Sequence, residues 1–432
     1  MICRSYLFLF CFLFSTLSFA DPLIRVEGAS FKPLPIAISD VATPENSGLK
    51  TPATQLAKTV RNDLDLCGVF TILNAKSFLV DPNKEGFAIK EINFENWRNV
   101  GADALVKIKM SRQEDILIVE SFIFDVATQK SRAKRNYKAP SNMLRQLAHR
   151  ISDDIYKAFT GEAGVMGQPL IAIKRIGQTK HVVQLDADGQ NTKQMSKGGR
   201  LNLLPSFSPD ATKIYYTSYR YDNPDLFVMN VMNQKYERIS KRPGLNTGGV
   251  LSPDGSKLAV TLSINDNTDI YLMDPDGKNA KRLTSAWGID TSPSWSPDGQ
   301  KLAFVSSRSG NPHIFIMNKD GSDQTRMTFK GKYNQTPRWS PRGTHIVFSA
   351  RDERNKYDLF LLDIRSGLIS RITQDQGNNE DPAFAANGRL IVFASTRHGT
   401  RDLFISNLDG THQRRITKGG HYWTPAWAPF KP

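Results

Sequence analysis

Two short acidic motifs are the residues of this chain whose types and spacing come nearest to a chemical site. Asp186-Ala187-Asp188-Gly189 and Asp274-Pro275-Asp276-Gly277 resemble the start of a calcium loop, in which alternating carboxylates hold the ion. Such a loop also needs a bidentate acid further along the chain, and neither motif is followed by one. Aspartate before glycine is equally typical of a two-residue hairpin turn. We therefore predict turns at both motifs, and no metal or other cofactor.

Motifs for hydrolytic catalysis are missing from the sequence. A serine hydrolase of the α/β class needs Gly-x-Ser-x-Gly, which places the nucleophile on a sharp turn between a strand and a helix, and no such motif occurs. The zinc pattern His-Glu-x-x-His is absent too, and the seven histidines are scattered. These absences favour a binding protein over an enzyme.

A repeat in the second half of the chain predicts which elements position these turns. An apolar residue followed by a Ser-Pro-Asp-Gly-like turn leads each copy, at Phe207, Leu251, Trp295, Trp339, Phe384 and Trp427. The successive spacings are 44, 44, 44, 45 and 43 residues. Proline presets φ in such a turn, aspartate bonds nearby backbone and glycine accepts unusual dihedral angles. A period in this range is typical of a β-propeller with four-stranded blades.

The strands of each repeat predict the number of blades and how the ring closes. A hairpin of third and fourth strands occurs six times, near 181–196, 225–240, 269–284, 313–328, 358–373 and 402–417. The first copy has no inner strand before it, whereas the inner strand at 422–427 ends the chain. We therefore predict a six-bladed propeller closed by the C-terminal strand, which removes an open sheet edge.

A separate N-terminal domain is predicted ahead of the propeller. Short extended segments at 23–26 and 35–39, a helix at 54–66, strands at 102–110 and 116–126, and a helix capped by Ser141 indicate an α/β domain. Gly161 ends that helix, and 161–167 reads as a linker. The predicted fold class is thus α+β multidomain, with the N-terminal domain at 21–162 and the propeller at 163–432.

The first twenty residues are predicted to be a secretory signal. Arg4 precedes an apolar run over 6–17, and Ser18-Phe19-Ala20 supplies small residues before a cleavage site at Asp21. A membrane anchor is the alternative, but the run is short for a bilayer span. Only Cys67 remains after cleavage, so no internal disulfide is possible, and its apolar neighbours predict a buried side chain.

The propeller carries most of the positive charge. Residues 161–432 contain 36 basic and 25 acidic side chains, against 20 and 17 in 21–160. A basic surface suits an anionic partner, and export argues against nucleic acid. The alternative is that the arginine before each fourth strand is a solvated edge residue.

Taken together, these features resemble the TolB family of the Tol-Pal system. The resemblance is carried by the export signal, the α/β domain, the six blades and the C-terminal sequence Trp427-Ala428-Pro429-Phe430. It implies a monomeric periplasmic binding protein that maintains the outer membrane and supports cell division. The implied partners are the peptidoglycan-associated lipoprotein Pal, the inner-membrane protein TolA and other outer-membrane proteins. An exported enzyme or glycan-binding propeller with its site in the central channel is the alternative.

The resemblance also implies two sets of contact residues. The Pal-facing residues would lie at one mouth of the propeller, just before or at the start of the inner strands: Leu245, Asn246, Thr247, Gly248, Asp290, Thr291, Asn334, Gln335, Glu380, Asp381, Tyr422 and Trp423. Those facing TolA would be the first residues after the signal: Asp21, Pro22, Leu23, Ile24, Arg25, Val26, Glu27 and Gly28. The alternating apolar residues of the second set could add as a strand to a partner's sheet, or form an edge strand of their own domain.

Overall fold

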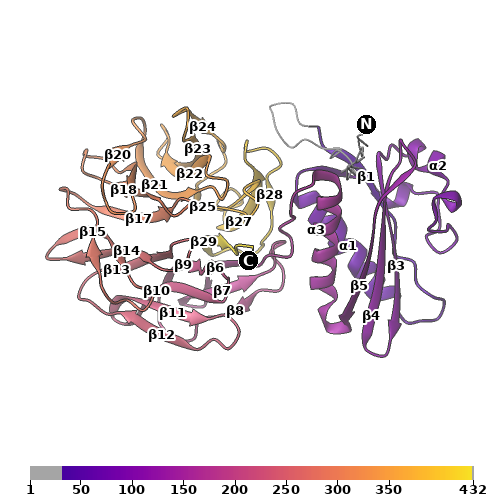
Figure 1. Ribbon diagram of the computed structural model, residues 1–432, viewed down its shortest axis with the longest axis horizontal. Coiled ribbons are helices and arrows are strands. Elements are labelled where there is room, and N and C mark those ends of the chain that lie inside the picture. The colour runs from indigo at the N-terminus through magenta and orange to yellow at the C-terminus, as the bar shows by residue number, and fades with distance from the viewer. Residues whose placement is uncertain (1–31, 431–432) are drawn as a thin grey trace, which may run out of the picture.

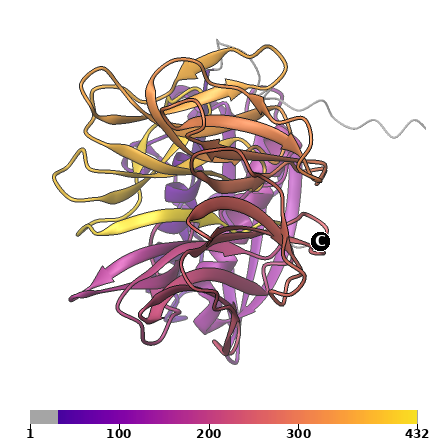
Figure 2. The same cartoon turned by 90° about the vertical axis from the view of Figure 1, so that its left-hand side faces the viewer.

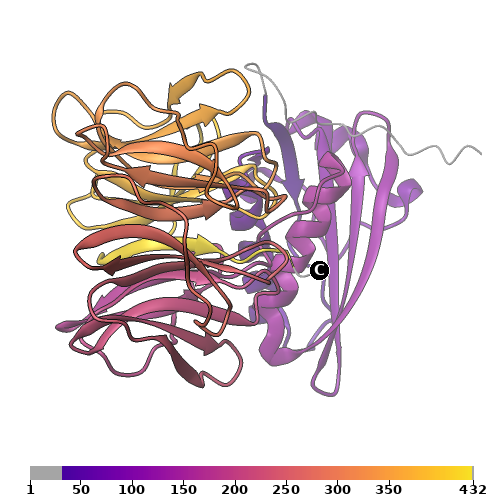
Figure 3. The same ribbon diagram turned by 60° about the vertical axis from the view of Figure 1, so that its left-hand side comes forward.

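The computed structural model describes residues 32–430 of the 432-residue chain. The predicted secretory signal (1–20) and the predicted TolA-binding segment (21–28) lie outside this range. An N-terminal domain and a propeller lie side by side, with helices α1 (Lys50–Leu66) and α3 (Leu144–Thr160) between the N-terminal sheet and the propeller (Figures 1 and 3). The predicted fold class is confirmed.

The N-terminal domain is one five-stranded sheet covered on both faces. Its strand order is β2–β1–β3–β4–β5, in which β1 runs parallel to β2 and β3. Helices α1 and α3 cover one face with apolar stripes that include Val60 and Ile151, and α2 buries Phe94 and Trp97 on the other. The strands and the remaining short helices are β1 (Leu34–Ile38), β2 (Phe70–Ile72), β3 (Ala104–Gln113), β4 (Ile116–Asp125), β5 (Lys130–Pro140), η1 (Ala75–Ser77), η2 (Ile89–Glu91), α2 (Phe94–Asn99) and η3 (Ser141–Met143).

Three features of this domain depart from the sequence prediction or were missed by it. Ser141 does not cap α3, because the turn η3 intervenes and the Ser141 hydroxyl donates to the Asp115 carbonyl at 3.0 Å. Strand β5 was missed because its alternation is mostly polar, as suits an edge strand. Helix α1 begins four residues earlier than predicted, at Lys50. Gly161 ends α3 with φ +75°, as predicted, and Cys67 is free and buried.

The propeller consists of six four-stranded antiparallel sheets, as predicted. Five blades follow one another along the chain: β9 (Asn202–Phe207), β10 (Lys213–Tyr221), β11 (Asn223–Asn230), β12 (Tyr236–Ser240); β13 (Asn246–Leu251), β14 (Leu258–Ile264), β15 (Asn267–Met273), β16 (Lys281–Arg282); β17 (Asp290–Trp295), β18 (Lys301–Ser306), β19 (His313–Asn318), β20 (Thr325–Arg326); β21 (Lys332–Trp339), β22 (His345–Arg351), β23 (Tyr357–Asp363), β24 (Ile369–Arg371); β25 (Asn379–Phe384), β26 (Leu390–Ser395), β27 (Asp402–Asn407), β28 (Arg414–Arg415). Apolar clusters between neighbouring blades form the propeller core.

The sixth blade, which we call the closing blade, joins the two ends of the propeller. It consists of β29 (Tyr422–Trp427), β6 (Leu170–Ile176), β7 (Thr179–Leu185) and β8 (Lys193–Gln194), in that order (Figure 1). Trp427 pairs with Leu170 in an antiparallel ladder, and the Ala428 amide donates to the Pro169 carbonyl at 2.9 Å. The predicted closure by the C-terminal strand is confirmed.

The Ser-Pro-Asp-Gly repeat forms the turn between the first and second strands of a blade. In the β13–β16 blade, the Ser252 hydroxyl donates to Asp254 at 2.5 Å and accepts from the Lys257 amide at 3.0 Å. The Ser252 hydroxyl and the Ser256 amide lower the pKa of the Asp254 carboxyl to about 2. Gly255 has φ +72°, a conformation that favours glycine. The repeated motif is therefore turn chemistry.

In several blades the arginine of the fourth strand forms an ion pair with a buried aspartate of the third strand. The Arg282 guanidinium lies 2.5 Å from the buried carboxylate of Asp269 at the start of the third strand. The Thr284 hydroxyl donates to the same carboxylate at 3.1 Å and accepts from the Ile270 amide. The same arrangement recurs as Asp358–Arg371–Thr373 and Asp402–Arg415–Thr417. In these blades the suggestion of a purely solvated arginine is wrong.

Candidate functional site at the propeller mouth

The two ends of the propeller differ in what covers them. The N-terminal domain lies against the end that carries the Ser-Pro-Asp-Gly turns and the Asp-Gly hairpins. Glu162 pairs with Arg342 and Arg389 at 2.7 and 2.6 Å, and Arg145 bonds to Asp186 and Asp188 at 3.0 and 2.8 Å. The opposite end, where the inner strands begin, is the mouth. Figure 2 shows the propeller in front of the N-terminal domain.

The structure places the twelve predicted Pal-facing residues together at the mouth, but it separates them into two groups. One residue at or near the start of each inner strand is buried, as for Asn246, Asp290, Asn334 and Tyr422. These side chains are used within the propeller: Asn246 accepts from the Ser240 hydroxyl of the preceding blade at 2.5 Å, and Asp290 pairs with Arg308 of its own blade at 2.8 Å. The others are half-buried: Leu245, Thr247, Gly248, Thr291, Gln335, Glu380, Asp381 and Trp423.

Each inner strand carries a β-bulge near its start. The pairing with the second strand shifts register in all six blades. One residue near this bulge in each inner strand is left-handed, with φ between 43° and 69°: Leu204, Gly248, Ser292, Thr336, Asp381 and Thr424. Five of these six are not glycine, and a left-handed conformation costs such a residue roughly 1 kcal/mol. A bulge changes the direction of the neighbouring side chains. The half-buried residues named above therefore form a mostly polar ring around the mouth, which we call the polar ring.

Charged groups face one another beneath this ring. Glu380 pairs with Arg401 at 2.6 Å, and the Asp381 carboxylate accepts from the Thr424 amide at 3.1 Å. Burial raises the pKa of both carboxyls, and the positive charge of Arg401 works against that rise. Burial also lowers the pKa of the Arg338 guanidinium, which the nearby charge of Asp381 partly offsets. Each carboxylate has a cationic neighbour, an arrangement that is more typical of a protein interface than of a catalytic acid–base pair.

Comparisons with known proteins agree with this architecture. Residues 156–431 match the family model described as the TolB beta propeller domain, and residues 22–132 match that of the TolB amino-terminal domain. The Tol-Pal system protein TolB of Anaeromyxobacter sp. (strain K) is 41% identical over 413 residues, which cover 95% of this chain and 94% of that protein.

The chain belongs to the TolB family.

Two further relatives support the assignment. The match to the TolB of Myxococcus xanthus (strain DK1622) is 41% identical but spans only 47% of this chain and 46% of that protein. The crystal structure of TolB from Acinetobacter baumannii superposes with a TM-score of 0.82 at 28% identity, covering 95% of this chain and 98% of that one. The fold and domain order described above are those of the TolB family.

Several exposed apolar side chains at the mouth of this TolB family member were not predicted from the sequence. Trp287 and Phe329 are 80% and 71% exposed, in the loops that lead into β17 and β21. Ile289 and Tyr333 lie beside them and are also exposed. Large aromatic side chains are typical anchors of protein interfaces. They lie outside the periodic strand pattern, so only their aromatic type near an inner-strand start could have identified them.

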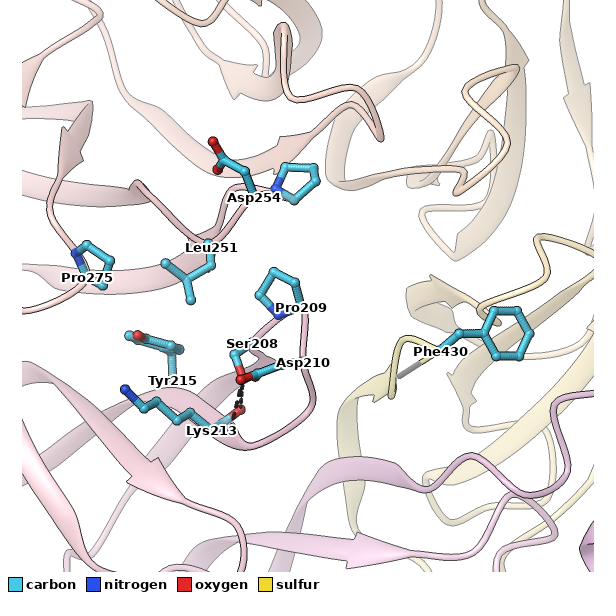
Figure 4. Close-up of a pocket in the computed structure, with 11 residues that line it drawn as sticks. Ser208, Pro209, Asp210, Lys213, Tyr215, Leu251, Asp254, Pro275 and Phe430 are labelled. Carbon is cyan, nitrogen blue, oxygen red and sulfur yellow. Dashed lines mark hydrogen bonds between the residues drawn. The ribbon is translucent and has the colours of Figure 1, made fainter. Parts of the chain in front are cut away.

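A pocket at the opposite end contains turn chemistry and no catalytic arrangement. It has a volume of about 420 Å³ and lies between the turns of the first two blades along the chain, with Phe430 from the C-terminal segment on its far side (Figure 4). Its serine, Ser208, donates to Asp210 at 2.5 Å and to the Lys213 carbonyl at 3.3 Å. The serine hydroxyl is thus used by the turn itself.

One group of possible metal ligands lies at the boundary between the domains. Within residues 32–430, ligand atoms of His149, Asp186 and Asp188 lie within 4.8 Å of one another. The Arg145 guanidinium already bonds to both carboxylates. Burial opposes the charge of His149, but its hydrogen bonds to Asp186 and Asp63 raise its pKa to about 10. A protonated imidazole cannot coordinate a cation, so this group is an ion network between the domains. No helix in the described part of the chain is long and apolar enough to cross a membrane.

Proposed function

We propose that this chain is a periplasmic scaffold of the Tol-Pal system without catalytic activity, which binds Pal at the propeller mouth and TolA through 21–28. In this role it would maintain the outer membrane and support cell division, with other outer-membrane proteins as further partners. The observation that carries the proposal is the combination, at the uncovered end of the propeller, of exposed aromatic side chains with a half-buried polar ring. Protein interfaces commonly combine large apolar side chains with polar groups that fix the orientation of the partner.

The geometry of the mouth favours a protein partner over a small substrate. Its polar groups are spread over several blades and are bonded to their own neighbours, as Glu380 is to Arg401. An enzyme site would need a nucleophile or two free carboxyl groups close together. We therefore propose direct contacts from the half-buried residues of the ring and from Trp287 and Phe329, with Asn246, Asp290 and Asn334 supporting the loops from beneath.

Calorimetric titration of residues 21–432 with the soluble domain of Pal from the same organism tests the mouth. We expect saturable one-to-one binding that Trp287→Ala or Phe329→Ala weakens about 30-fold or more, as for aromatic anchors at other interfaces. Replacement of Thr291 should also weaken binding. Met232→Ala is the matched control, because Met232 is 88% exposed in a hairpin at the opposite end. Absence of binding by the unaltered, folded chain would refute the proposal.

A second titration tests the N-terminal segment. A chain that begins at residue 29 should lose binding to the periplasmic domain of TolA while it keeps its affinity for Pal, because an extended segment adds affinity through its own backbone hydrogen bonds. A peptide of residues 21–32 should bind TolA without the rest of the chain. Unchanged TolA binding by the shortened chain would contradict this assignment.

A further inference from the structure

Positively charged side chains gather on one side of the mouth, on the closing blade and its neighbour. Lys180 of β7 lies over the ring of Trp423, with 4.1 Å from its Nζ atom to the ring centroid. His421 stacks on the same Trp423 ring, with 6.3 Å between the two ring centroids and an interplanar angle of 19°. Arg175 of β6 contacts both ring nitrogens of His421, at 2.9 and 2.8 Å. Arg401 lies next to them, since its carbonyl accepts from the Tyr422 amide.

In the part of the chain that the structure describes, Arg401 pairs with Glu380, whereas no ion pair joins Lys180 or Arg175 to a carboxylate. Burial and then the charges of Arg401 and Arg175 lower the pKa of Lys180, and Asp381 offsets this only in part. The nearest acids are already engaged, Glu380 with Arg401 and Asp381 with the Thr424 amide. Among the residues that the structure describes, no carboxylate lies within 4.0 Å of the Lys180 ammonium group. An incoming negative charge would therefore relieve repulsion between like charges.

The opposite side of the mouth has a different character. Trp287 and Ile289 lead into β17, and β17 belongs to the blade three places from the closing blade in a ring of six (Figure 1). The apolar loops and the cationic group thus face each other across the channel. A protein that covers the mouth meets both at once, which fixes its orientation.

We propose that Arg175, Lys180 and Arg401, set around Trp423, form a subsite for an aspartate or glutamate side chain of the protein that binds the mouth. This proposal rests on the proposed function. The planar guanidinium of Arg175 and the ammonium group of Lys180 can both donate hydrogen bonds to an incoming carboxylate, and the indole face of Trp423 positions that ammonium group. A protein carboxylate is favoured over a lipid phosphate because the subsite shares the mouth with exposed aromatic anchors.

The test compares Lys180→Met with the unaltered chain in titrations with the soluble domain of Pal, at several salt concentrations. Methionine keeps an unbranched apolar side chain beside Trp423 and removes the ammonium group, with its charge, its hydrogen-bond donors and its contact with the indole ring. We expect an affinity about 5- to 30-fold lower and a weaker dependence on salt, as for a charge-assisted hydrogen bond at an interface. Lys278→Met is the control, since it removes the same charge from an exposed hairpin at the opposite end and should change affinity less than twofold.

A double-mutant cycle identifies the partner group. Acidic residues on the Pal domain are replaced one at a time by their amides, and one of these changes should have little further effect in the Lys180→Met background. Normal binding by Lys180→Met, with a wild-type circular dichroism spectrum, would overturn the subsite and leave the proposed function intact. Loss of binding to anionic vesicles, with Pal binding unchanged, would assign the cations to a lipid and also overturn it. Failure of the unaltered chain to bind Pal would instead refute the proposed function.

Discussion

His149 offers the sharpest prediction about how the two domains are held together. Its Nδ1 atom lies 2.8 Å from the Asp63 carboxylate of α1, and its Nε2 atom lies 3.4 Å from the Asp186 carboxylate of the propeller. Two more charged groups lie close to His149: the Asp188 carboxylate of the propeller and the Arg145 guanidinium, which is on α3 like His149 itself. Burial alone would lower the pKa of this imidazole, but the hydrogen bonds and charges of the acids raise it from 6.5 to about 10. The folded protein therefore holds a charged histidine at neutral pH.

The sign and size of the effect follow from this shift. A group whose pKa rises on folding contributes its full stability below its unfolded pKa and loses that contribution as the pH rises through its folded pKa. The interval from pH 7 to pH 9 lies between these two values. Each pKa unit corresponds to about 1.4 kcal/mol, so the stability difference between wild type and His149→Gln should fall by about 2.5 kcal/mol over that interval.

Urea unfolding followed by circular dichroism at 222 nm measures this difference. Within residues 32–430 the α-helices all belong to the N-terminal domain, so this wavelength reports chiefly on that domain. His398→Gln is the control, because His398 is exposed and should show no comparable trend between pH 7 and pH 9. A wild-type-minus-His149→Gln difference that stays constant from pH 7 to pH 9 would show that the histidine is not charged in the folded protein.

Three further predictions concern the propeller, each measured as a change in the urea midpoint. Arg282→Ala leaves the buried Asp269 carboxylate without its guanidinium partner and should lower the free energy of unfolding by about 2–4 kcal/mol. An unchanged midpoint would show that this ion pair does not stabilise the blade. Asp290→Asn should cost less than about 1.5 kcal/mol, because the β25–β28 blade already has asparagine at this position: Asn379 accepts from Arg397 at 2.8 Å, as Asp290 does from Arg308. Loss of folding would show that asparagine cannot replace aspartate here. Thr424→Gly should stabilise by about 0.5–1 kcal/mol, because a β-branched residue there has φ +43°, and destabilisation would show that the bulge is not strained.

The architecture of the propeller was predictable because its determinants are local and repeated. Turn chemistry at Ser252 and Asp254 recurs at a fixed interval, and a missing inner strand can be supplied only by 422–427. The N-terminal domain was less predictable. Strand β5 has little apolar alternation to mark it, and the start of α3 depends on the contact of Ser141 with Asp115, 26 residues away in the sequence.

The candidate site was predictable in position but not in detail. The inner-strand starts do meet at one end of the channel, yet sequence alone could not separate the buried Asn246 from the half-buried Thr247. That difference depends on a bulge which five of the six blades build without glycine. The cationic group around Trp423 joins β6, β7 and β29, which lie at opposite ends of the propeller sequence, so no local pattern could have revealed it.

Site-specific photo-cross-linking in cells tests the central claim, that the mouth is the face that binds Pal. A photoreactive residue at Thr291 or Gln335, both half-buried at the mouth, should cross-link to Pal. The same residue at Met232 or Lys278, in hairpins at the opposite end, should not. Cross-links from the opposite end alone, with none from the mouth, would contradict the account.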